Sequence, residues 1–161
     1  MEEWNKIFEI NKKLDEEFIK KCNCNSEEYY KKNCIELIVE ISEFANETKC
    51  FKYWSIKSAD KDKVLEEYAD AITMVLSFFT TLNVELDNIG NHCETNDVIV
   101  IFNELFKDAS CMLESGSEEL IKRIFSNLIY VGELLNYSKE DIYEACYKKM
   151  NIVSERLNSN Y

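Results

Sequence analysis

The near absence of residues that break helices is the feature that most constrains the fold of this chain. Its 161 residues include no proline and only three glycines, Gly90, Gly116 and Gly132. Lys, Glu, Leu and Ile occur throughout, and these residues favour helix over other structures. A chain with so few turn-forming residues is expected to be all-α, and its length suits one domain with a substantial core. We therefore predict a single-domain helical bundle over residues 1–161.

Apolar periodicity and capping residues predict six helices. The predicted segments cover residues 2–22, 26–48, 60–84, 96–113, 117–136 and 138–157. The predicted N-terminal caps are Ser26, Asp60 and Ser138, and Ser117 is expected to start the fifth segment. Asp141 follows Ser138 in the spacing of a capping box. The apolar run VIVIF at residues 98–102 leaves a β-strand as the alternative for the fourth segment.

The charge of the chain bears on its partners and its location. A formal net charge of −12 argues against nucleic-acid binding through a broad basic surface. It does not argue against a phosphorylated small molecule, because bound divalent cations reverse the sign of a site. The first residues are charged and amphipathic rather than signal-like, and no apolar run is long enough to span a membrane. With an odd count of seven cysteines, these features predict a cytoplasmic protein with reduced thiols.

A stripe of acidic residues runs along an otherwise apolar predicted helix. At about 100° per residue, Glu36, Glu40, Glu43 and Glu47 fall within about 60° on one side of this helix. Carboxylates four residues apart on a helix repel each other. Because no Lys or Arg lies between Glu36 and Lys49, nothing within the stripe neutralises this repulsion.

Two acidic pairs on successive predicted helices are expected to meet. Glu40 and Glu43 form E-x-x-E, and Glu67 and Asp70 form E-x-x-D. Residues three apart share a helix face, and the short connection makes the two helices antiparallel neighbours. Four carboxylates would then converge between the helices, and hard oxygen ligands of this kind suit Mg²⁺ or Mn²⁺. We therefore predict a metal site at these four residues.

Solvated helix faces are the alternative explanation for these acids. Against it, apolar residues continue the direction of Glu67 along its helix and flank the line of Glu40, so the acids border a core. Carboxylates at a buried edge need a partner. A salt-bridge network with Lys52 or Lys57 would provide one as well as a metal ion would.

Several stretches of the sequence resemble one enzyme family. VEISEFANETKCFKYWSIK, followed by LEEYADAITMVLS, is similar to the dimeric all-α dUTPases of the MazG-like all-α NTP pyrophosphatase superfamily. The resemblance runs from IFEINKKLDEEF near the start to YKKMNIVSERLNSNY at the end. The superfamily shares the acidic pairs, whereas NETKCFKYWS is more specific to the dUTPase branch. The resemblance implies a metal-dependent homodimer that hydrolyses dUTP to dUMP and pyrophosphate by water attack at the α-phosphate.

The resemblance also assigns roles to residues. Glu40, Glu43, Glu67 and Asp70 would be the metal ligands, and Glu40 or Glu43 would orient or deprotonate the water. The substrate-binding residues that it implies are Asn11, Lys52, Trp54, Lys57, Thr73, Lys149, Arg156 and Tyr161. For Trp54, packing at the junction of helix and loop is the alternative to contact with the base.

Some positions depart from the family pattern. Asn11 stands where the family has Gln, Thr73 where it has His, and Val153 where it has Asn. Such positions line the base and sugar pocket in relatives, so we predict a weaker preference for dUTP, with dUTP still ranked first. Two alternatives remain. One is a pyrophosphohydrolase of the same fold that acts on dCTP or a purine dNTP, and the other is a non-catalytic acidic helical protein that binds a macromolecule.

Overall fold

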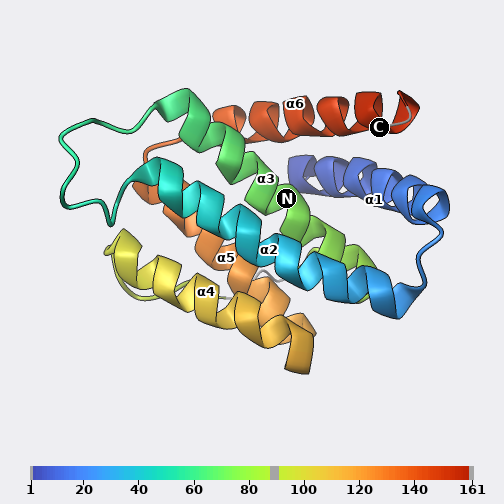
Figure 1. Ribbon diagram of the computed structural model, residues 1–161. Helices are drawn as coiled ribbons and strands as arrows, with labels where there is room; N and C mark the ends of the chain where they lie inside the picture. The colour runs from blue at the N-terminus through green and yellow to red at the C-terminus, as the bar shows by residue number, and fades with distance from the viewer. Residues whose placement is uncertain (1, 88–90, 160–161) are drawn as a thin grey trace.

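Six α-helices make up the part of the chain that the computed structural model describes, residues 2–87 and 91–159 (Figure 1). They are α1 (Glu2–Cys22), α2 (Ser26–Thr48), α3 (Lys61–Thr81), α4 (Val98–Ser115), α5 (Glu118–Leu134) and α6 (Lys139–Asn158). These ranges contain no strand, and the VIVIF run lies in α4. The predicted all-α bundle of six helices is therefore confirmed.

Side-chain caps start the helices from α2 onward. The predicted caps Asp60 and Ser138 are confirmed, and each accepts a hydrogen bond from a backbone N–H. Ser117, predicted to start α5, caps this helix in the same way. Ser138 and Asp141 complete the capping box of α6. The predicted cap Ser26 is wrong, because Asn25 performs this role by accepting a hydrogen bond from the backbone of Glu28 at 2.9 Å.

Asparagine takes the place of glycine beyond the ends of three helices. Asn23, Asn83 and Asn136 follow α1, α3 and α5 with φ angles of 49°, 53° and 61°. Asparagine adopts this left-handed conformation more readily than other residues that carry a side chain. A chain with three glycines can thus still turn between six helices. The left-handed Asn83 also explains why α3 ends at Thr81 and not near Val84 as predicted.

The central helix of the bundle is α3. It contacts α1 and α6 on one side and α2 and α5 on the other, and α4 packs outside on α2 and α5 (Figure 1). The helices α2 and α3 are antiparallel neighbours, as predicted. All residues from Ala71 to Phe79 of α3 are buried. Helices of the same chain thus cover both apolar sides of α3, so the burial of this helix does not require a second subunit.

A close approach between α3 and α5 depends on a glycine. A Cβ atom at Gly132 of α5 would lie 2.6 Å from the hydroxyl oxygen of Tyr68 on α3. Tyr68 is fully buried and lies between Glu67 and Asp70 in sequence. The packing of this side chain therefore holds the turn of α3 that carries two of the predicted metal ligands.

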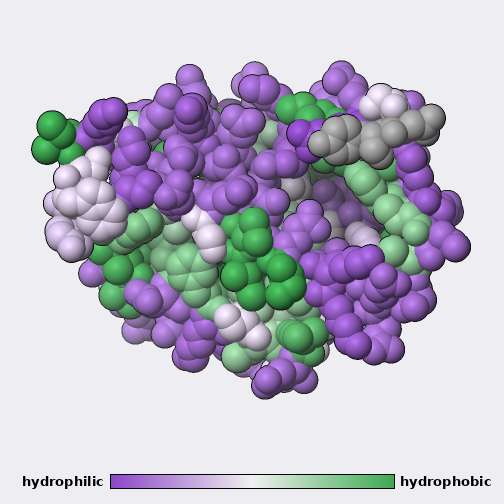
Figure 2. Space-filling model, viewed as in Figure 1, coloured by the Kyte–Doolittle hydropathy of each residue, from purple (hydrophilic) through white to green (hydrophobic). Residues whose placement is uncertain are grey.

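Exposed apolar side chains gather on one face of the molecule. Figure 2 shows hydrophobic residues in the middle of the view, over α2 and α4. The large apolar side chains that these two helices expose are Ile35, Val39, Ile99, Val100 and Leu113. We call these five residues the α2–α4 patch. None of the described helices is long and apolar enough to cross a membrane.

Candidate active site

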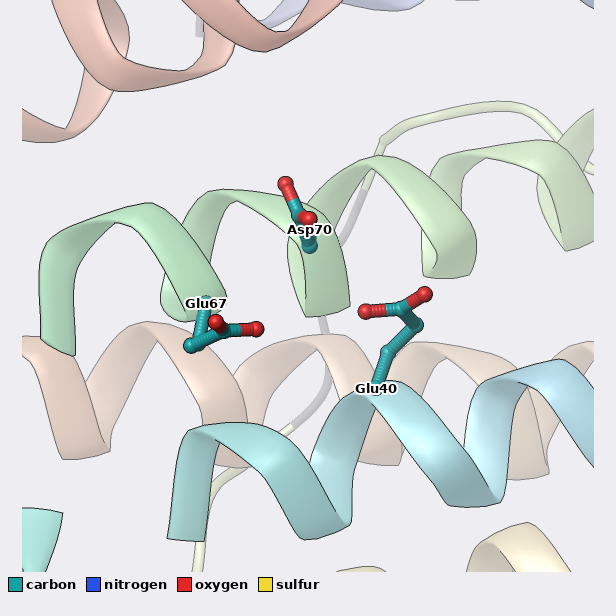
Figure 3. Close-up of side chains that lie close together, drawn as sticks. All are labelled: Glu40, Glu67 and Asp70. Atoms are coloured by element: carbon teal, nitrogen blue, oxygen red, sulfur yellow. The ribbon is translucent and has the colours of Figure 1, made fainter. Parts of the chain in front are cut away.

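Three of the four predicted metal ligands meet between α2 and α3. One oxygen atom from each of Glu40, Glu67 and Asp70 lies within 4.8 Å of the other two. Figure 3 shows Glu40 rising from α2 toward α3, which carries Glu67 and Asp70. These three residues, hereafter the carboxylate cluster, form the single group of this kind among the described His, Cys, Asp and Glu residues. Glu43 is exposed and lies outside the group, but its charge raises the pKa of Glu40 and Glu67.

Burial and mutual repulsion raise the pKa of all three carboxyl groups. The pKa of Glu40 rises to about 7, first because of burial and then because of the charge of Asp70. Burial is also the main reason why the pKa values of Glu67 and Asp70 are raised. Within the described residues, Oε2 of Glu40 and Oδ1 of Asp70 are buried without a hydrogen-bond partner. Repelling charges and unpartnered oxygens fit a divalent cation, which would bind these oxygens and supply positive charge.

A lysine from α6 partly neutralises the carboxylate cluster. Lys149 donates a hydrogen bond to Oδ2 of Asp70, and this contact counteracts the effect of burial on the pKa of Asp70. The charge of Lys149 also lowers the pKa of Glu40. Lys149 thus pairs with the cluster, in the place that the salt-bridge alternative gave to Lys52 or Lys57.

A cavity of about 590 Å³ extends from the carboxylate cluster along α3. Six of the predicted site residues line it: Asn11, Glu40, Asp70, Thr73, Lys149 and Arg156. Asp70, Thr73 and Ser77 all line the cavity, because positions three and seven residues apart share one face of a helix. A cavity of this size suits a nucleotide-sized ligand.

The far end of the cavity is polar, and of its residues the sequence had indicated only Asn11. Asp15 accepts hydrogen bonds from Oγ of Ser77 at 2.9 Å and from Nδ2 of Asn11 at 3.2 Å. The hydroxyl of Tyr29 lies 3.5 Å from the same carboxylate. Burial raises the pKa of Asp15 to about 7, although these hydrogen bonds act to lower it.

Asn33 completes this polar end. Its side chain is 4% exposed and lines the cavity, and Nδ2 has no hydrogen-bond partner within the described part of the chain. Burial raises the pKa of Tyr29 to about 12, and the amide of Asn33, which lies beside the Tyr29 hydroxyl, acts to lower this pKa. The geometry of this contact is not that of a hydrogen bond from Nδ2. Hereafter, the polar end means Asn11, Asp15, Tyr29, Asn33 and Ser77.

One sequence signal would have found the polar end. Asp15 lies four residues after Asn11, and Asn33 lies seven residues before Glu40. Both spacings place a polar residue on the same helix face as a predicted site residue. Polar residues on the apolar faces of these helices were therefore the missed signal.

Several other predicted site residues lie away from the cavity. Residues 49–60 form the loop between α2 and α3, and three of its predicted site residues do not line the described cavity: Lys52, Trp54 and Lys57. Trp54 is 64% exposed and meets two aromatic rings of the same loop edge-on, with ring centroids 6.2 and 5.0 Å away. Tyr161 lies outside the described residues.

Comparison with known protein families gives a match over almost the whole chain. Residues 3–161 match the family described as dUTPase. A search of curated proteins found no match. The matched range includes both the carboxylate cluster and the polar end.

Proposed function

This chain belongs to the all-α dUTPase family, and on that premise we propose that it is a metal-dependent dUTP diphosphatase. Family membership supports a hydrolase that acts on nucleoside triphosphates. The finer proposal is hydrolysis of dUTP to dUMP and pyrophosphate, by attack of water on the α-phosphate. The observation that carries it is the carboxylate cluster at one end of a cavity large enough for a nucleotide.

Glu40, Glu67 and Asp70 would hold Mg²⁺ or Mn²⁺, because carboxylate oxygens are the ligands that these ions prefer. A bound ion neutralises phosphate charge, lowers the pKa of a water molecule and stabilises the leaving pyrophosphate. We assign Glu40 and Glu43 as the candidate groups that orient this water or accept its proton. The exposed side chain of Glu43 can reach a water molecule outside the buried cluster.

Lys149 and Arg156 are the cations that line the cavity near the carboxylate cluster. We propose that both contact the phosphates, since guanidinium suits bidentate contacts and ammonium acts as a point charge. Lys149 would exchange Asp70 for a phosphate oxygen when a metal ion binds Asp70. Lys52, Trp54 and Lys57 would contact the nucleotide if the loop 49–60 closed over the cavity.

Thr73 lines the cavity beside Asp70, and Asn11 lines it at the polar end, as expected of residues near the sugar and the base. Neither reproduces the side chain that the family usually has at its position. We therefore propose that dUTP is the preferred substrate, with a smaller preference over other pyrimidine nucleotides than a fully equipped pocket would give.

We also propose that the protein is a homodimer, as the family resemblance implies. The α2–α4 patch is the apolar surface that a second copy would cover. Charged residues are usually depleted at the centre of such an interface. The apolar side chains of the patch agree with this rule.

Pyrophosphate release from each of the four dNTPs and from dUTP, with Mg²⁺ and with EDTA, tests the proposed activity. We expect release to be fastest from dUTP and to stop in EDTA. The non-catalytic alternative predicts no release from any nucleotide and no binding of Mg²⁺ or Mn²⁺. Release from a purine dNTP in preference to dUTP would support the alternative substrate class.

A further inference from the structure

The polar end lies at the distance from the carboxylate cluster where a base would lie. Ser77 follows Asp70 by seven residues on α3, which corresponds to about 10 Å along a helix. This span leaves room for a deoxyribose between a phosphate at Asp70 and a base at Ser77. The buried carboxylate of Asp15 therefore stands at the base end of the cavity.

Asn33 indicates that this end binds a ligand. A buried hydrogen-bond donor without a partner is rare in folded proteins, and a bound ligand is one reason for its presence. Nδ2 of Asn33 is such a donor among the described residues, and its side chain lines the cavity. A base with a hydrogen-bond acceptor on its ring would satisfy it.

The hydrogen bonds of Asp15 decide which groups it can offer to a base. Its two oxygens already accept hydrogen bonds from Ser77 and Asn11, with Tyr29 nearby. Each carboxylate oxygen can accept more than one hydrogen bond, so Asp15 retains free acceptor capacity. Burial raises the pKa of Asp15 to about 7, although the neighbouring donors act to lower it. At pH 8, the pH of the assays below, the ionised acceptor form therefore dominates, and in this form Asp15 has no proton to donate.

Free acceptor capacity distinguishes the two pyrimidines. Cytosine carries an amino group at C4, and Asp or Glu side chains accept hydrogen bonds from it. Uracil carries an oxygen at C4, which a carboxylate cannot bind, although its N3–H can still donate. A pocket built for uracil alone would present a donor at the position of that oxygen. Asp15 presents an acceptor.

We propose that Asp15 accepts a hydrogen bond from the amino group of cytosine, and that Asn33 donates to a ring acceptor of the same base. The protein would then hydrolyse dCTP to dCMP and pyrophosphate alongside dUTP, and Asp15 would be a specificity-determining residue. The reaction part of this inference rests on the proposed function. The recognition part rests on the polar end and is independent of the metal ligands.

Asp15→Asn is the variant that tests the inference, because asparagine keeps the shape of the side chain and adds a donor. The donor suits the C4 oxygen of uracil and removes one acceptor position for the cytosine amino group. We expect the ratio of kcat/KM for dUTP to that for dCTP to rise by about tenfold or more, within the range of one base-edge contact. Glu16→Gln is the matched control, since it removes the same charge from an exposed neighbouring position on α1.

A purely structural role for Asp15 predicts a different result. Asp15 connects α1 with Ser77 of α3, so its replacement could lower activity toward both substrates equally. An unchanged ratio of kcat/KM in Asp15→Asn would overturn the inference. So would a wild-type preference for dUTP over dCTP greater than about 10³, because an acceptor for cytosine would then have no effect on selection.

Binding of dCMP and dUMP in EDTA separates this inference from the proposed function. Calorimetric titration of wild type, Asp15→Asn and Glu16→Gln measures base recognition without catalysis. We expect Asp15→Asn to weaken dCMP binding relative to dUMP, and Glu16→Gln to leave the ratio unchanged. If no dNTP is hydrolysed but this shift is seen, the proposed function fails and the recognition by Asp15 stands. Equal effects on dCMP and dUMP overturn the recognition by Asp15, whether or not dUTP is hydrolysed.

Discussion

Lys149 donates a hydrogen bond to one carboxylate oxygen of Asp70, and the other oxygen of Asp70 is buried without a partner among the described residues. One lysine is not enough for the carboxylate cluster, because the pKa of all three carboxyl groups stays above the ordinary value. A divalent ion would supply the missing positive charge. Lys149 and such an ion would therefore compete for Asp70.

Lys149→Met tests this competition, because methionine is unbranched and nearly as long as lysine but carries no charge. The variant removes the hydrogen bond and the charge that Lys149 gives to Asp70, so we expect metal-free protein to lose about 1–3 kcal/mol of stability and several degrees in Tm. The increase in Tm on addition of Mn²⁺ should be larger than in wild type. Thermal denaturation with Mn²⁺ and with EDTA measures both effects.

Lys148→Met is the control for this variant, since Lys148 is exposed on the same helix. It should change neither Tm in EDTA nor the Mn²⁺ effect. A Mn²⁺-dependent increase in Tm that is equal in Lys149→Met and wild type would contradict the competition.

Glu40→Gln should abolish pyrophosphate release and leave the fold intact. The pKa of Glu40 is raised by burial and by the charge of Asp70, so its ionised form is unfavourable without a metal ion. Removing that charge should keep or raise Tm in EDTA while it weakens Mn²⁺ binding. Glu9→Gln, at an exposed position of α1, should behave as wild type in both assays. Full activity of Glu40→Gln would show that the cluster is not the catalytic centre.

Asp15 makes stability depend on pH. Its pKa is raised from 3.8 to about 7, so the folded protein retains a proton that the unfolded chain releases in this range. The free energy of unfolding therefore falls as pH rises from about 4 to about 7, by up to about 4 kcal/mol at 1.36 kcal/mol per unit. Asp15→Asn lacks this group. Its Tm relative to wild type should rise from pH 4 to pH 7 and then level off, and a constant difference would contradict the raised pKa.

Local patterns predicted the helices and the acidic pairs. Asp60 and the Ser138–Asp141 box act through backbone groups within the same turn, so their effect can be read from adjacent residues. Glu67 and Asp70 share a face because the helical period fixes their directions. Adjacent residues do not show that Asn25, and not Ser26, caps α2, because both residue types are good caps.

Contacts between residues that are far apart in the sequence were not predicted. Lys149 and Asp70 are 79 residues apart, and Asp15 and Ser77 are 62 residues apart. Such pairs depend on how α6 and α1 pack on α3, which no helical period specifies. The predicted partners Lys52 and Lys57 were close in sequence, but the loop that carries them keeps them away from the cavity.

Gly132→Ala should destabilise the protein, although alanine is the better helix former. A Cβ at this position would lie 2.6 Å from the hydroxyl oxygen of Tyr68, which is fully buried and cannot move aside without cost. We expect a loss of about 1–3 kcal/mol in urea denaturation. Combination with Tyr68→Phe should recover part of it by removing the hydroxyl. An equal or greater stability of Gly132→Ala would show that the helices can separate freely.

Light scattering at micromolar concentration should give twice the 19.0 kDa mass of one chain. The α2–α4 patch is the proposed interface, and burial of its apolar side chains would stabilise the dimer by about 25 cal/mol per Å². Val39→Lys places a charge within this patch, where desolvation would be unfavourable, and should shift the particle to the mass of one chain. Ile56→Lys is the control, since Ile56 is fully exposed and lies in the loop 49–60, outside the patch. A wild-type particle of 19.0 kDa would rule out the homodimer, and a dimeric Val39→Lys variant would rule out this interface.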